Sequence, residues 1–256
     1  MLSTLEEILT STAVNDDICH RACEKRIMKH MVKVKNELSS EMVKQYGSDA
    51  GAIVVGIAAS KDFDSAPEGF KPFDKLEGCL SVIVLGAPFP KESLLKTSAE
   101  YTETRNAMYK RMDGIAKEVA KLIKQDGYKA AAVGGIGGKW VDGFTHGAVS
   151  LKHAAELAGL GTIGKNYLLI SPKYGNLLWF SAVLTDADLI PDERSGYSVC
   201  DDCNKCVEAC PSKALDDLAT FKKKECSRTC FKYVEGKWKL VCYQCRTVCP
   251  YCFGEE

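Results

Sequence analysis

The stretch CDDCNKCVEACP, residues 200–211, decides how the C-terminal part of this chain folds. Its four cysteines follow the spacing C-x2-C-x2-C-x3-C-P, which is the bacterial-ferredoxin pattern for binding [4Fe–4S] clusters. A cubane cluster needs one thiolate on each of four irons, so a turning backbone supplies three from one run and a distant cysteine completes the set. Pro211 then ends the short helix and turns the chain away. The sequence therefore predicts an iron–sulfur module in this segment.

A second, incomplete copy of the pattern follows as Cys242-Tyr-Gln-Cys245-Arg-Thr-Val-Cys249-Pro250. Ten of the thirteen cysteines lie after residue 199, so the metal ligands are expected in one module. In two-cluster ferredoxins the fourth cysteine of a run binds the other cluster. This crossover predicts a cluster A held by Cys200, Cys203, Cys206 and Cys249. It predicts a cluster B held by Cys210, Cys242, Cys245 and one further cysteine, for which Cys226 and Cys230 are both open.

Two other kinds of site use closely spaced cysteines, a disulfide framework and a zinc site. A disulfide framework is disfavoured because the N-terminal sequence has no export pattern and we expect a cytoplasmic protein. Zinc is the stronger rival, since paired C-x2-C units also bind zinc. Zinc sites do not call for a third cysteine two residues further on and then C-x3-C-P, so the motif favours iron–sulfur.

Charge and hydropathy exclude several classes of function. The 256 residues include 34 basic and 34 acidic side chains, so the formal net charge is zero and no global field attracts nucleic acid or an anionic membrane. The longest apolar runs, 52–59 and 82–89, have the length of strands and are too short to span a bilayer. We expect a soluble protein without membrane association, from an anaerobic source because exposed clusters and thiols oxidise.

The rest of the chain alternates helical and strand patterns. Apolar periodicity predicts helices within 1–47 and over 100–125 and 150–158, and strands over 50–59, 80–85, 129–133, 167–171 and 177–184. The last two strands are expected to form a hairpin through the turn 172–175. The glycine-rich run 134–147 is expected to be irregular, and 186–195 to be a linker. These patterns predict an α/β core over 1–195 and an iron–sulfur domain over 196–256.

A glycine loop, Gly159-Leu-Gly161-Thr-Ile-Gly164-Lys165-Asn166, matches both the dinucleotide fingerprint and most of a P-loop. Both motifs require a strand before the loop and a helix after it, so that phosphate meets the helix N-terminus. Here the helix comes first and a strand follows, so neither reading holds. The loop can still approach a ligand closely through its backbone, with the lysine as an anion contact. The alternative is a helix stop followed by a turn.

The block SLKHAAELAGLGTIGKN at 150–166, the strand ending Leu184-Thr185-Asp186 and the cysteine run together resemble the epoxyqueuosine reductase family, with reductive dehalogenases as more distant relatives. The resemblance implies an α+β fold, in which a nitroreductase-like α/β sandwich core is joined to a C-terminal ferredoxin-like domain. It also implies two [4Fe–4S] clusters that feed electrons to a cobalamin in the core, with flavin as a less favoured cofactor.

Several residue roles follow from this resemblance alone. The family's lone cysteine between the two runs matches Cys226, which would complete cluster B. The glycine loop lies beside the corrin in that family, so Gly161, Gly164, Lys165 and Asn166 would contact the cofactor. The family's proton donor stands in V-D-S-A-P, to which Val141-Asp142-Gly143 is the nearest match although Ser-Ala-Pro is absent. Asp142 is thus a candidate catalytic residue, and His146 competes with it.

The sequence favours a small-molecule substrate over tRNA. The family's C-terminal helical region, which helps to hold tRNA, is not expected in this chain, and Lys222-Lys223-Lys224 is the main basic cluster. An external electron donor of the ferredoxin or flavodoxin type is expected. The alternatives are a two-cluster electron-transfer protein or redox subunit without its own organic cofactor, and a binding protein with a structural cluster.

Overall fold

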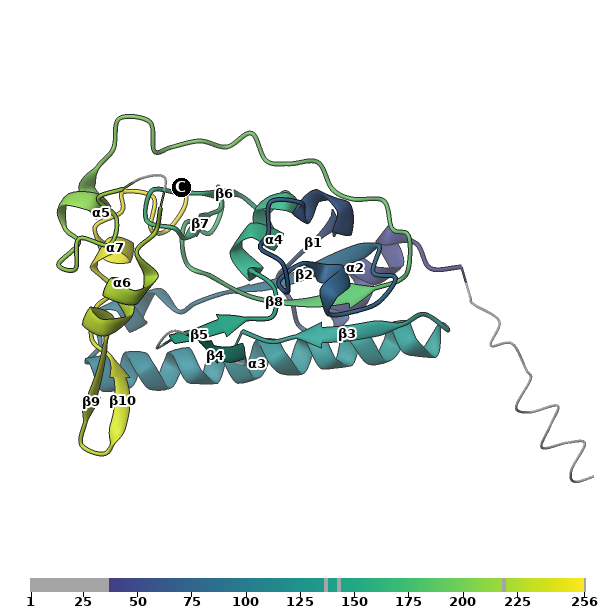
Figure 1. Ribbon diagram of the computed structural model, residues 1–256, viewed down its shortest axis with the longest axis horizontal. Coiled ribbons are helices and arrows are strands. Elements are labelled where there is room, and N and C mark those ends of the chain that lie inside the picture. Colours follow the sequence, from purple (N-terminus) through teal and green to yellow (C-terminus); the bar gives the residue numbers. More distant parts are fainter. Residues whose placement is uncertain (1–36, 136–137, 142–143, 218–219, 256) are drawn as a thin grey trace, which may run out of the picture. The chain divides into compact units, whose positions relative to one another are not determined.

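A four-stranded antiparallel sheet lies at the centre of the fold, in the order β1-β2-β8-β3 (Figure 1). Its strands are β1 (Val54–Ala59), β2 (Ser81–Pro88), β8 (Leu178–Thr185) and β3 (Ala130–Val133). The computed structural model describes residues 37–135, 138–141, 144–217 and 220–255. It confirms the predicted mixture of helices and strands.

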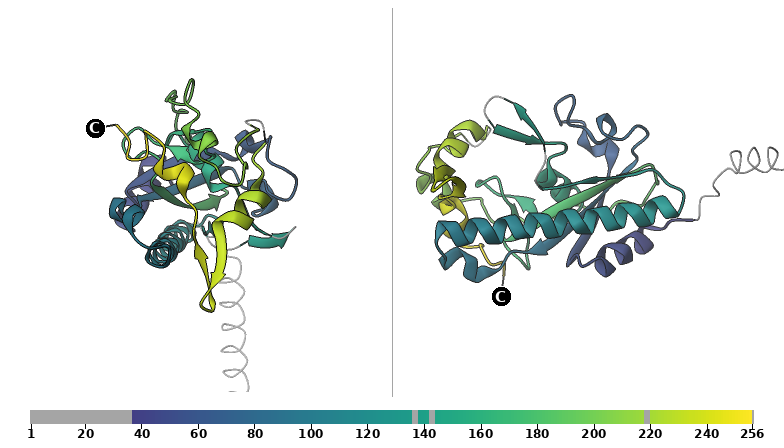
Figure 2. Two further views of the ribbon diagram at one scale, coloured as in Figure 1. Left: turned by 90° about the vertical axis from the view of Figure 1, so that its left-hand side faces the viewer. Right: turned by 90° about the horizontal axis from the view of Figure 1, so that it is seen from below.

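Side chains of the sheet alternate between two hydrophobic layers, as the pleat requires. The helices α2 (Ser40–Asp49) and α3 (Ser98–Gln125) cover one face, and α3 runs along the whole sheet (Figure 2). The α3 layer includes Ile57, Ile83, Leu85, Val183, Met112, Ile115, Val119 and Ile123. The helix α4 (Leu151–Leu157) covers the other face, in a layer that includes Val82, Val84, Ala182, Leu184, Ala154 and Ala155. The predicted apolar stripe of 100–125 is therefore core.

The long helix α3 begins with a capping box. The Thr97 hydroxyl accepts from the Glu100 amide at 3.3 Å, and the Thr97 amide donates to the Glu100 carboxylate at 3.0 Å. This pair fixes the end of α3 that lies nearest the cysteine-rich segment (Figure 1).

The predicted hairpin between 167–171 and 177–184 is wrong. β7 (Leu169–Ile170) pairs with β6 (Thr162–Ile163), whereas β8 pairs with β2 on one side and β3 on the other. Every residue of β8 is buried, which is typical of a central strand that needs a partner along both edges. The turn at 172–175 is nevertheless present, closed by a bridge between Ser171 and Gly175.

The run 134–147 also differs from the prediction, because it contains the hairpin of β4 (Gly138–Val141) and β5 (Phe144–Gly147). Aromatic and β-branched residues in these short segments favour strands, and the high glycine content conceals that signal in the sequence.

The segment that follows β8 runs back along the molecule towards the cysteine-rich elements (Figure 1). Asp192 fixes this segment to the outer strand: its carboxylate accepts from the Ile57 amide at 2.9 Å, and the Lys44 ammonium lies 2.5 Å from it. The Asp192 amide also donates to the Ile57 carbonyl at 2.8 Å. The linker predicted for 186–195 therefore covers the edge of β1, which protects an otherwise unpaired strand.

The remaining elements lie near the N-terminal end of α3 (Figures 1 and 2). They are α5 (Lys205–Glu208), α6 (Lys223–Cys230), β9 (Phe231–Val234), β10 (Lys237–Leu240) and α7 (Gln244–Thr247). Elsewhere in the chain, short 3-10 turns occur at Ser60–Phe63, Pro72–Asp74 and Lys91–Leu95. Residues 37–256 group into one compact unit, and the predicted boundary after 195 stays a prediction. None of the helices in the described ranges is both long enough and apolar enough to cross a bilayer.

Candidate metal centre and core cavity

The two cysteine runs fold into two equivalent turns. Each carries one short helix, α5 or α7, and these helices pack on each other. In the first turn the Cys210 amide donates to the Val207 carbonyl at 3.2 Å, and in the second the Cys249 amide donates to the Arg246 carbonyl at 3.4 Å. Each turn thus closes onto its own helix immediately before the proline that ends the cysteine run. The defective second copy keeps the shape of the first.

The four cysteines predicted for cluster A are brought together, and we call them group A: Cys200, Cys203, Cys206 and Cys249. Burial, together with the neighbouring Cys200, Cys249 and Cys203 thiolates, raises the pKa of the Cys206 thiol to about 11. Burial also raises the pKa of Cys249, with Cys200 and Cys203 again adding to the rise. These mutual effects place Cys249 beside the first run, as the crossover prediction requires.

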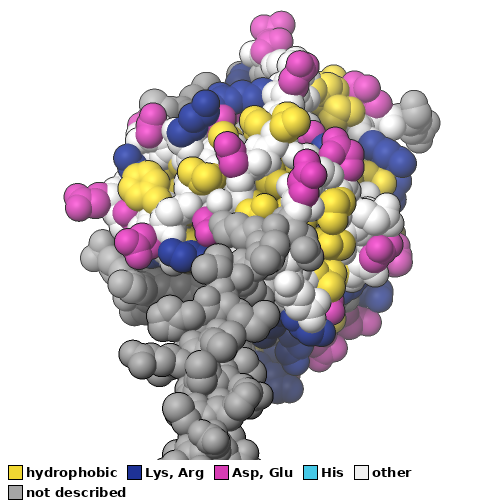
Figure 3. Space-filling model, turned by 90° about the vertical axis from the view of Figure 1, so that its right-hand side faces the viewer, with side chains coloured by type: hydrophobic (Ala, Val, Ile, Leu, Met, Phe, Trp, Pro, Cys, Tyr) yellow, Lys and Arg dark blue, Asp and Glu magenta, His cyan; other side chains and the backbone are white. Residues whose placement is uncertain are grey.

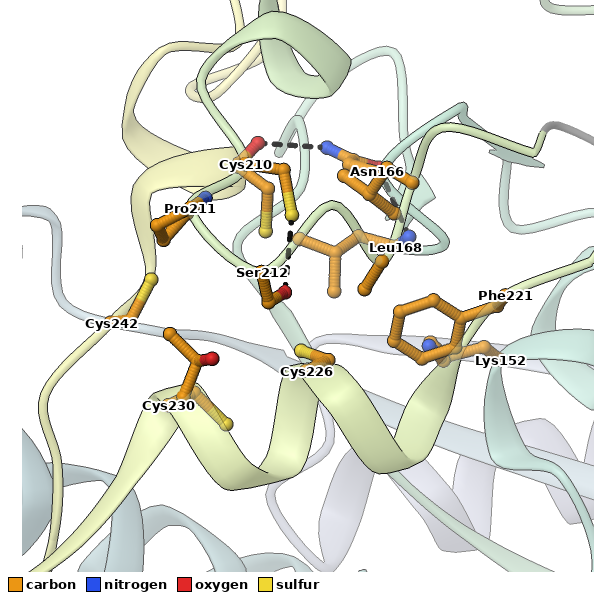
Figure 4. A pocket seen from close by; sticks show the side chains of 14 residues that line it. Lys152, Asn166, Leu168, Cys210, Pro211, Ser212, Phe221, Cys226, Cys230 and Cys242 are labelled. Carbon is orange, nitrogen blue, oxygen red and sulfur yellow. Dashed lines mark hydrogen bonds between the residues drawn. The ribbon is translucent and has the colours of Figure 1, made fainter.

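The cysteines predicted for cluster B surround a cavity of about 120 Å³, shown in Figure 4. We call them group B: Cys210, Cys226, Cys230, Cys242 and Cys245. Burial raises the pKa of Cys245 to about 12, and the Cys226, Cys242 and Cys206 thiolates contribute to the rise. Since Cys206 belongs to group A, the two groups are neighbours.

The thiols of Cys226 and Cys230, one helical turn apart on α6, are unequal. A hydrogen bond from Cys230 lowers the pKa of Cys226 to about 7, and the Lys152 cation lowers it too. The same hydrogen bond raises the pKa of Cys230, whose thiol also lies 3.8 Å from the Ser227 carbonyl of its own helix. The thiolate is the form that binds a metal, so Cys226 is the better prepared ligand.

The glycine loop packs against both cysteine runs. A Cβ on Gly164 would lie 3.1 Å from the Cys200 sulfur, so the loop backbone closely approaches group A. The Lys165 ammonium donates to the Asp201 carbonyl at 3.1 Å and to the Asn204 side chain at 3.0 Å. Buried Asn166 donates to the Cys245 carbonyl at 3.2 Å and lines the group B cavity. These predicted cofactor contacts therefore face the cysteines.

Gly161 has a different role in the loop. Its φ of +151° and the 2.3 Å that would separate a Cβ from the Ile170 carbonyl leave room only for glycine. The contact of Gly161 with a cofactor stays a prediction. Of the two catalytic candidates, Asp142 lies outside the described residues. His146 is in β5, with its backbone opposite Lys139, and its side chain lies outside the described set.

A second cavity of about 250 Å³ lies in the α/β core beside the first. It is lined by Tyr109, Gly135, Leu151, Lys152, Leu168, Leu169, Asn176, Leu178, Trp179, Phe180 and Arg246. Lys152 and Leu168 line both cavities and so form a shared wall. We call this second space the core cavity.

The polar residues of the core cavity were not found by sequence reasoning. Arg246 is buried, stacks over the Trp179 ring at 4.6 Å and donates to the Asn176 backbone and side-chain oxygens. The Trp179 indole nitrogen is buried and has no hydrogen-bond partner among the described residues. Burial lowers the pKa of Lys152 to about 8, and its ammonium donates to the Tyr167 carbonyl. The only sequence signal was the position of Arg246 inside the second cysteine run.

The donor set of group B suits an iron–sulfur cluster, because its ligands are soft thiolates surrounding a cavity. Within the described segments, no three His, Cys, Asp or Glu side chains lie close enough together to share a single metal ion. The group B thiols are instead spaced around the cavity, and group A gathers three cysteines of one run with one from the other.

Known proteins resemble this chain over different parts of its length. No family model matches it. It is 32% identical to an epoxyqueuosine reductase of Listeria monocytogenes over 120 residues, which are 43% of this chain and 31% of that protein. It is 30% identical to a tetrachloroethene reductive dehalogenase of Desulfitobacterium hafniense over 211 residues, 80% of this chain and 35% of that protein. The chain spans about a third of the length of these curated relatives.

Solved structures agree with these relatives. Epoxyqueuosine reductase from Streptococcus thermophilus superposes with a TM-score of 0.58 at 19% identity, over 84% of this chain and 66% of that chain. A catabolic reductive dehalogenase superposes with a TM-score of 0.64 at 21% identity, over 84% of this chain and 32% of that one. These matches show a shared mixed α/β fold, and with the sequence relatives they confirm the predicted resemblance.

Proposed function

We propose that this chain, a homologue of epoxyqueuosine reductases and reductive dehalogenases, is an iron–sulfur reductase. Groups A and B would each hold one [4Fe–4S] cluster, and electrons would pass one at a time to an acceptor in the core cavity. The relatives named as reductases support a reductase activity. That the substrate of this chain is a small molecule is part of the proposal.

The observation that carries the proposal is that group B adjoins both group A and the core cavity. Cys206 of group A raises the pKa of Cys245 of group B, so the two thiol sets lie close together. On its other side, group B meets the core cavity through Lys152 and Leu168. Electrons that enter at either group would then reach the core cavity through adjacent redox centres.

The clusters would supply one-electron transfer, and the protein would set their environment. The cations Lys152 and Arg246 offset the negative charge of group B thiolates, since both lower the pKa of a group B cysteine. Asn166 ties the glycine loop to the Cys245 carbonyl and so orients the second run. The apolar side chains of Leu168 and Leu169 line one wall of the core cavity.

Cobalamin stays a prediction that rests on the relatives. One related reductive dehalogenase has a structure that suggests a mechanism for B12-dependent dehalogenation. Sites for drug-sized ligands usually span about 300–1,000 Å³, and a corrinoid is larger than such ligands. The part of the core cavity that the described residues line measures about 250 Å³, which lies below that range.

The small cavity favours a second candidate function, an electron-transfer protein or redox subunit without its own organic cofactor. Such a protein would pass electrons from its clusters to a partner enzyme. It would show reversible reduction of the clusters and no turnover by itself.

One experiment separates the two candidates. The chain would be reconstituted anaerobically with iron and sulfide, mixed with hydroxocobalamin under reducing conditions and passed through a desalting column. Retention of about one cobalamin per chain would support the cobalamin-dependent reductase. Intact clusters with no retained cobalamin would reject it and support the second candidate.

The matched variant is Leu151→Trp. Leu151 lines the core cavity and not the group B cavity, so a tryptophan there should block a ligand and leave both clusters in place. Retention of cobalamin by this variant would show that the ligand binds elsewhere.

A further inference from the structure

We propose that α6 and the β9–β10 hairpin form the docking surface for an acidic electron-carrier protein that reduces the group B cluster. This surface, residues 222–240, is called the basic hairpin surface below. The inference rests on the proposed clusters and adds the place and the chemistry of the donor's binding site. The hairpin projects away from the sheet beside α6 in two perpendicular views (Figures 1 and 2).

Charge is concentrated on this surface. Seven Lys and Arg residues and two Glu residues lie between 222 and 240, a net charge of +5 in a chain whose total is zero. The two glutamates are already paired, Glu225 with Arg228 at 3.2 Å and Glu235 with Lys239 at 2.5 Å. The exposed cations are Lys222, Lys224, Arg228, Lys232 and Lys237. By contrast, Figure 3 shows acidic and basic side chains interspersed on the face of the molecule near α2.

The hairpin also exposes an aromatic pair. Tyr233 and Trp238 are each 64% exposed and lie edge to face, with ring centroids 5.5 Å apart. Aromatic residues of this kind are enriched at protein–protein interfaces, where they bury a large area. The register of β9 and β10 places Lys232, Lys237 and Lys239 on the opposite face of the hairpin from this pair. The hairpin therefore offers one aromatic face and one basic face to a partner that combines apolar and acidic groups.

The base of the hairpin is held firmly, so the surface is presented in a fixed place. The Leu240 amide donates to the Thr102 hydroxyl of α3 at 2.9 Å. The Arg105 guanidinium of α3 lies 5.3 Å from the centre of the Phe231 ring. A two-stranded hairpin is only marginally stable alone, and these contacts with α3 support it.

The surface lies directly over a group of metal ligands. The helix α6 carries both the exposed cations Lys224 and Arg228 and the cysteines Cys226 and Cys230, which line the group B cavity. A carrier bound to this helix would be close to the group B cluster. One electron would leave the reduced carrier, which is oxidised, and enter the cluster, which is reduced, and no bond or proton would be exchanged.

A basic surface with aromatic side chains can also bind RNA. The position over group B favours the protein carrier, because electron entry needs proximity to a cluster and RNA binding does not. The rest of the chain has a net charge of −5, which opposes an extended contact with a polyanion.

The test uses reconstituted protein and a purified acidic two-cluster bacterial ferredoxin, with a flavodoxin as a second carrier. The variant Lys224→Glu/Lys237→Glu should bind the oxidised carrier at least about tenfold more weakly at low salt, because charge complementarity governs the encounter. The rate of cluster reduction by the reduced carrier, followed by bleaching near 400 nm, should fall by a similar factor. Trp238→Ala should weaken binding without changing the dependence on salt.

The matched control is Lys61→Glu/Lys117→Glu, which changes the net charge equally at two exposed lysines outside the surface. It should stay within about twofold of the wild type. Dithionite should reduce the clusters equally in every variant, and a failure there would count against the clusters themselves. Equal effects of both double variants would overturn the docking proposal. Loss of binding to a tRNA stem-loop, with unchanged reduction by the carriers, would also overturn it.

Discussion

Cys226 and Cys230 illustrate how local contacts can choose between two candidate ligands. The sequence left both open because both lie between the two runs. In the structure both reach the group B cavity, but Cys230 donates to Cys226 and also lies near its own helix backbone. Cys226 in addition has the Lys152 cation beside it. These contacts favour Cys226 as the fourth ligand of cluster B, together with Cys210, Cys242 and Cys245.

Substitution of the two cysteines should give different iron contents. Cys226→Ser should remove one cluster and lower the iron content to about half, since a cubane needs four thiolates. Cys230→Ser should keep about eight irons per chain and serves as the control on the same helix. Iron and sulfide analysis of anaerobic protein measures both. The opposite result would assign Cys230 as the ligand.

The thiols of the metal-free protein should differ in reactivity with pH. With a pKa of about 7, Cys226 should be roughly half thiolate at neutral pH, whereas Cys206, with a pKa of about 11, should stay protonated. Alkylation of Cys226 by iodoacetamide should therefore rise as the pH passes through about 7, ahead of Cys206. Peptide mass spectrometry reads each site, and Lys152→Met should move the midpoint for Cys226 to higher pH. Equal labelling of the two sites at pH 7 would contradict this picture.

Arg246 should tune the group B cluster. Its guanidinium lowers the pKa of Cys245, which burial raises, so it stabilises negative charge in group B. The reduced cluster is more negative than the oxidised one, so Arg246 favours the reduced cluster. Arg246→Gln should lower the midpoint potential of one cluster by on the order of tens of mV, because net charge sets the potential. Arg246→Lys should keep most of the wild-type value. A redox titration followed by electron paramagnetic resonance can measure both, and identical shifts in the two variants would point to lost packing on Trp179.

Among the elements, the glycine loop joins the core to the cysteine runs. Lys165 contacts the first run and Asn166 contacts the second, so one loop holds both turns in place. The motif looked like a phosphate site in the sequence, and its order of helix and strand excluded that use. Its contacts with the cysteines depend on long-range packing that spacing alone does not reveal.

Substitution by alanine at two glycines should change the stability of the fold in opposite directions. Gly161→Ala should destabilise the fold by about 1–3 kcal/mol, because its φ is positive and a Cβ would meet the Ile170 carbonyl. Gly114→Ala, at an exposed position inside α3 with open space around it, should stabilise by about 0.5–1 kcal/mol. Thermal unfolding of the two variants measures the difference. A lower melting temperature for both would contradict the strain argument.

The sequence predicted some elements well and others poorly for physical reasons. The strand pattern at 177–184 located β8, but its predicted pairing was wrong because a fully buried strand needs a partner along each edge, and these partners are β2 and β3. The β9–β10 hairpin was missed because its strands are short and largely exposed, so no buried alternation marks them. Local periodicity locates an element, whereas its partners depend on contacts distant in sequence.

Over the whole molecule, the cysteine groups could be predicted and the core cavity could not. The cysteine groups could be predicted because the geometry of a cluster restricts the spacing of its ligands along the chain. The cavity is assembled from α3, α4, β8 and the second cysteine run, which supply Tyr109, Lys152, Trp179 and Arg246. No stretch of sequence holds more than a few of its residues, so the cavity became evident only in the folded chain.

The proposed arrangement leads electrons inwards. The basic hairpin surface lies over group B, group A adjoins group B, and the core cavity meets group B through Lys152 and Leu168. Electrons from the docked carrier therefore enter at group B. A substitution there should slow electron transfer to both group A and the core cavity.

The most direct test is the amount of iron and acid-labile sulfide in protein purified or reconstituted without oxygen. Two [4Fe–4S] clusters predict about eight irons and eight sulfides per chain, with electron paramagnetic resonance signals from interacting reduced clusters. Bound zinc in place of iron, with no labile sulfide, would contradict the account. An iron content near four that is unchanged in Cys226→Ser would also contradict it, because group B would then hold no cluster.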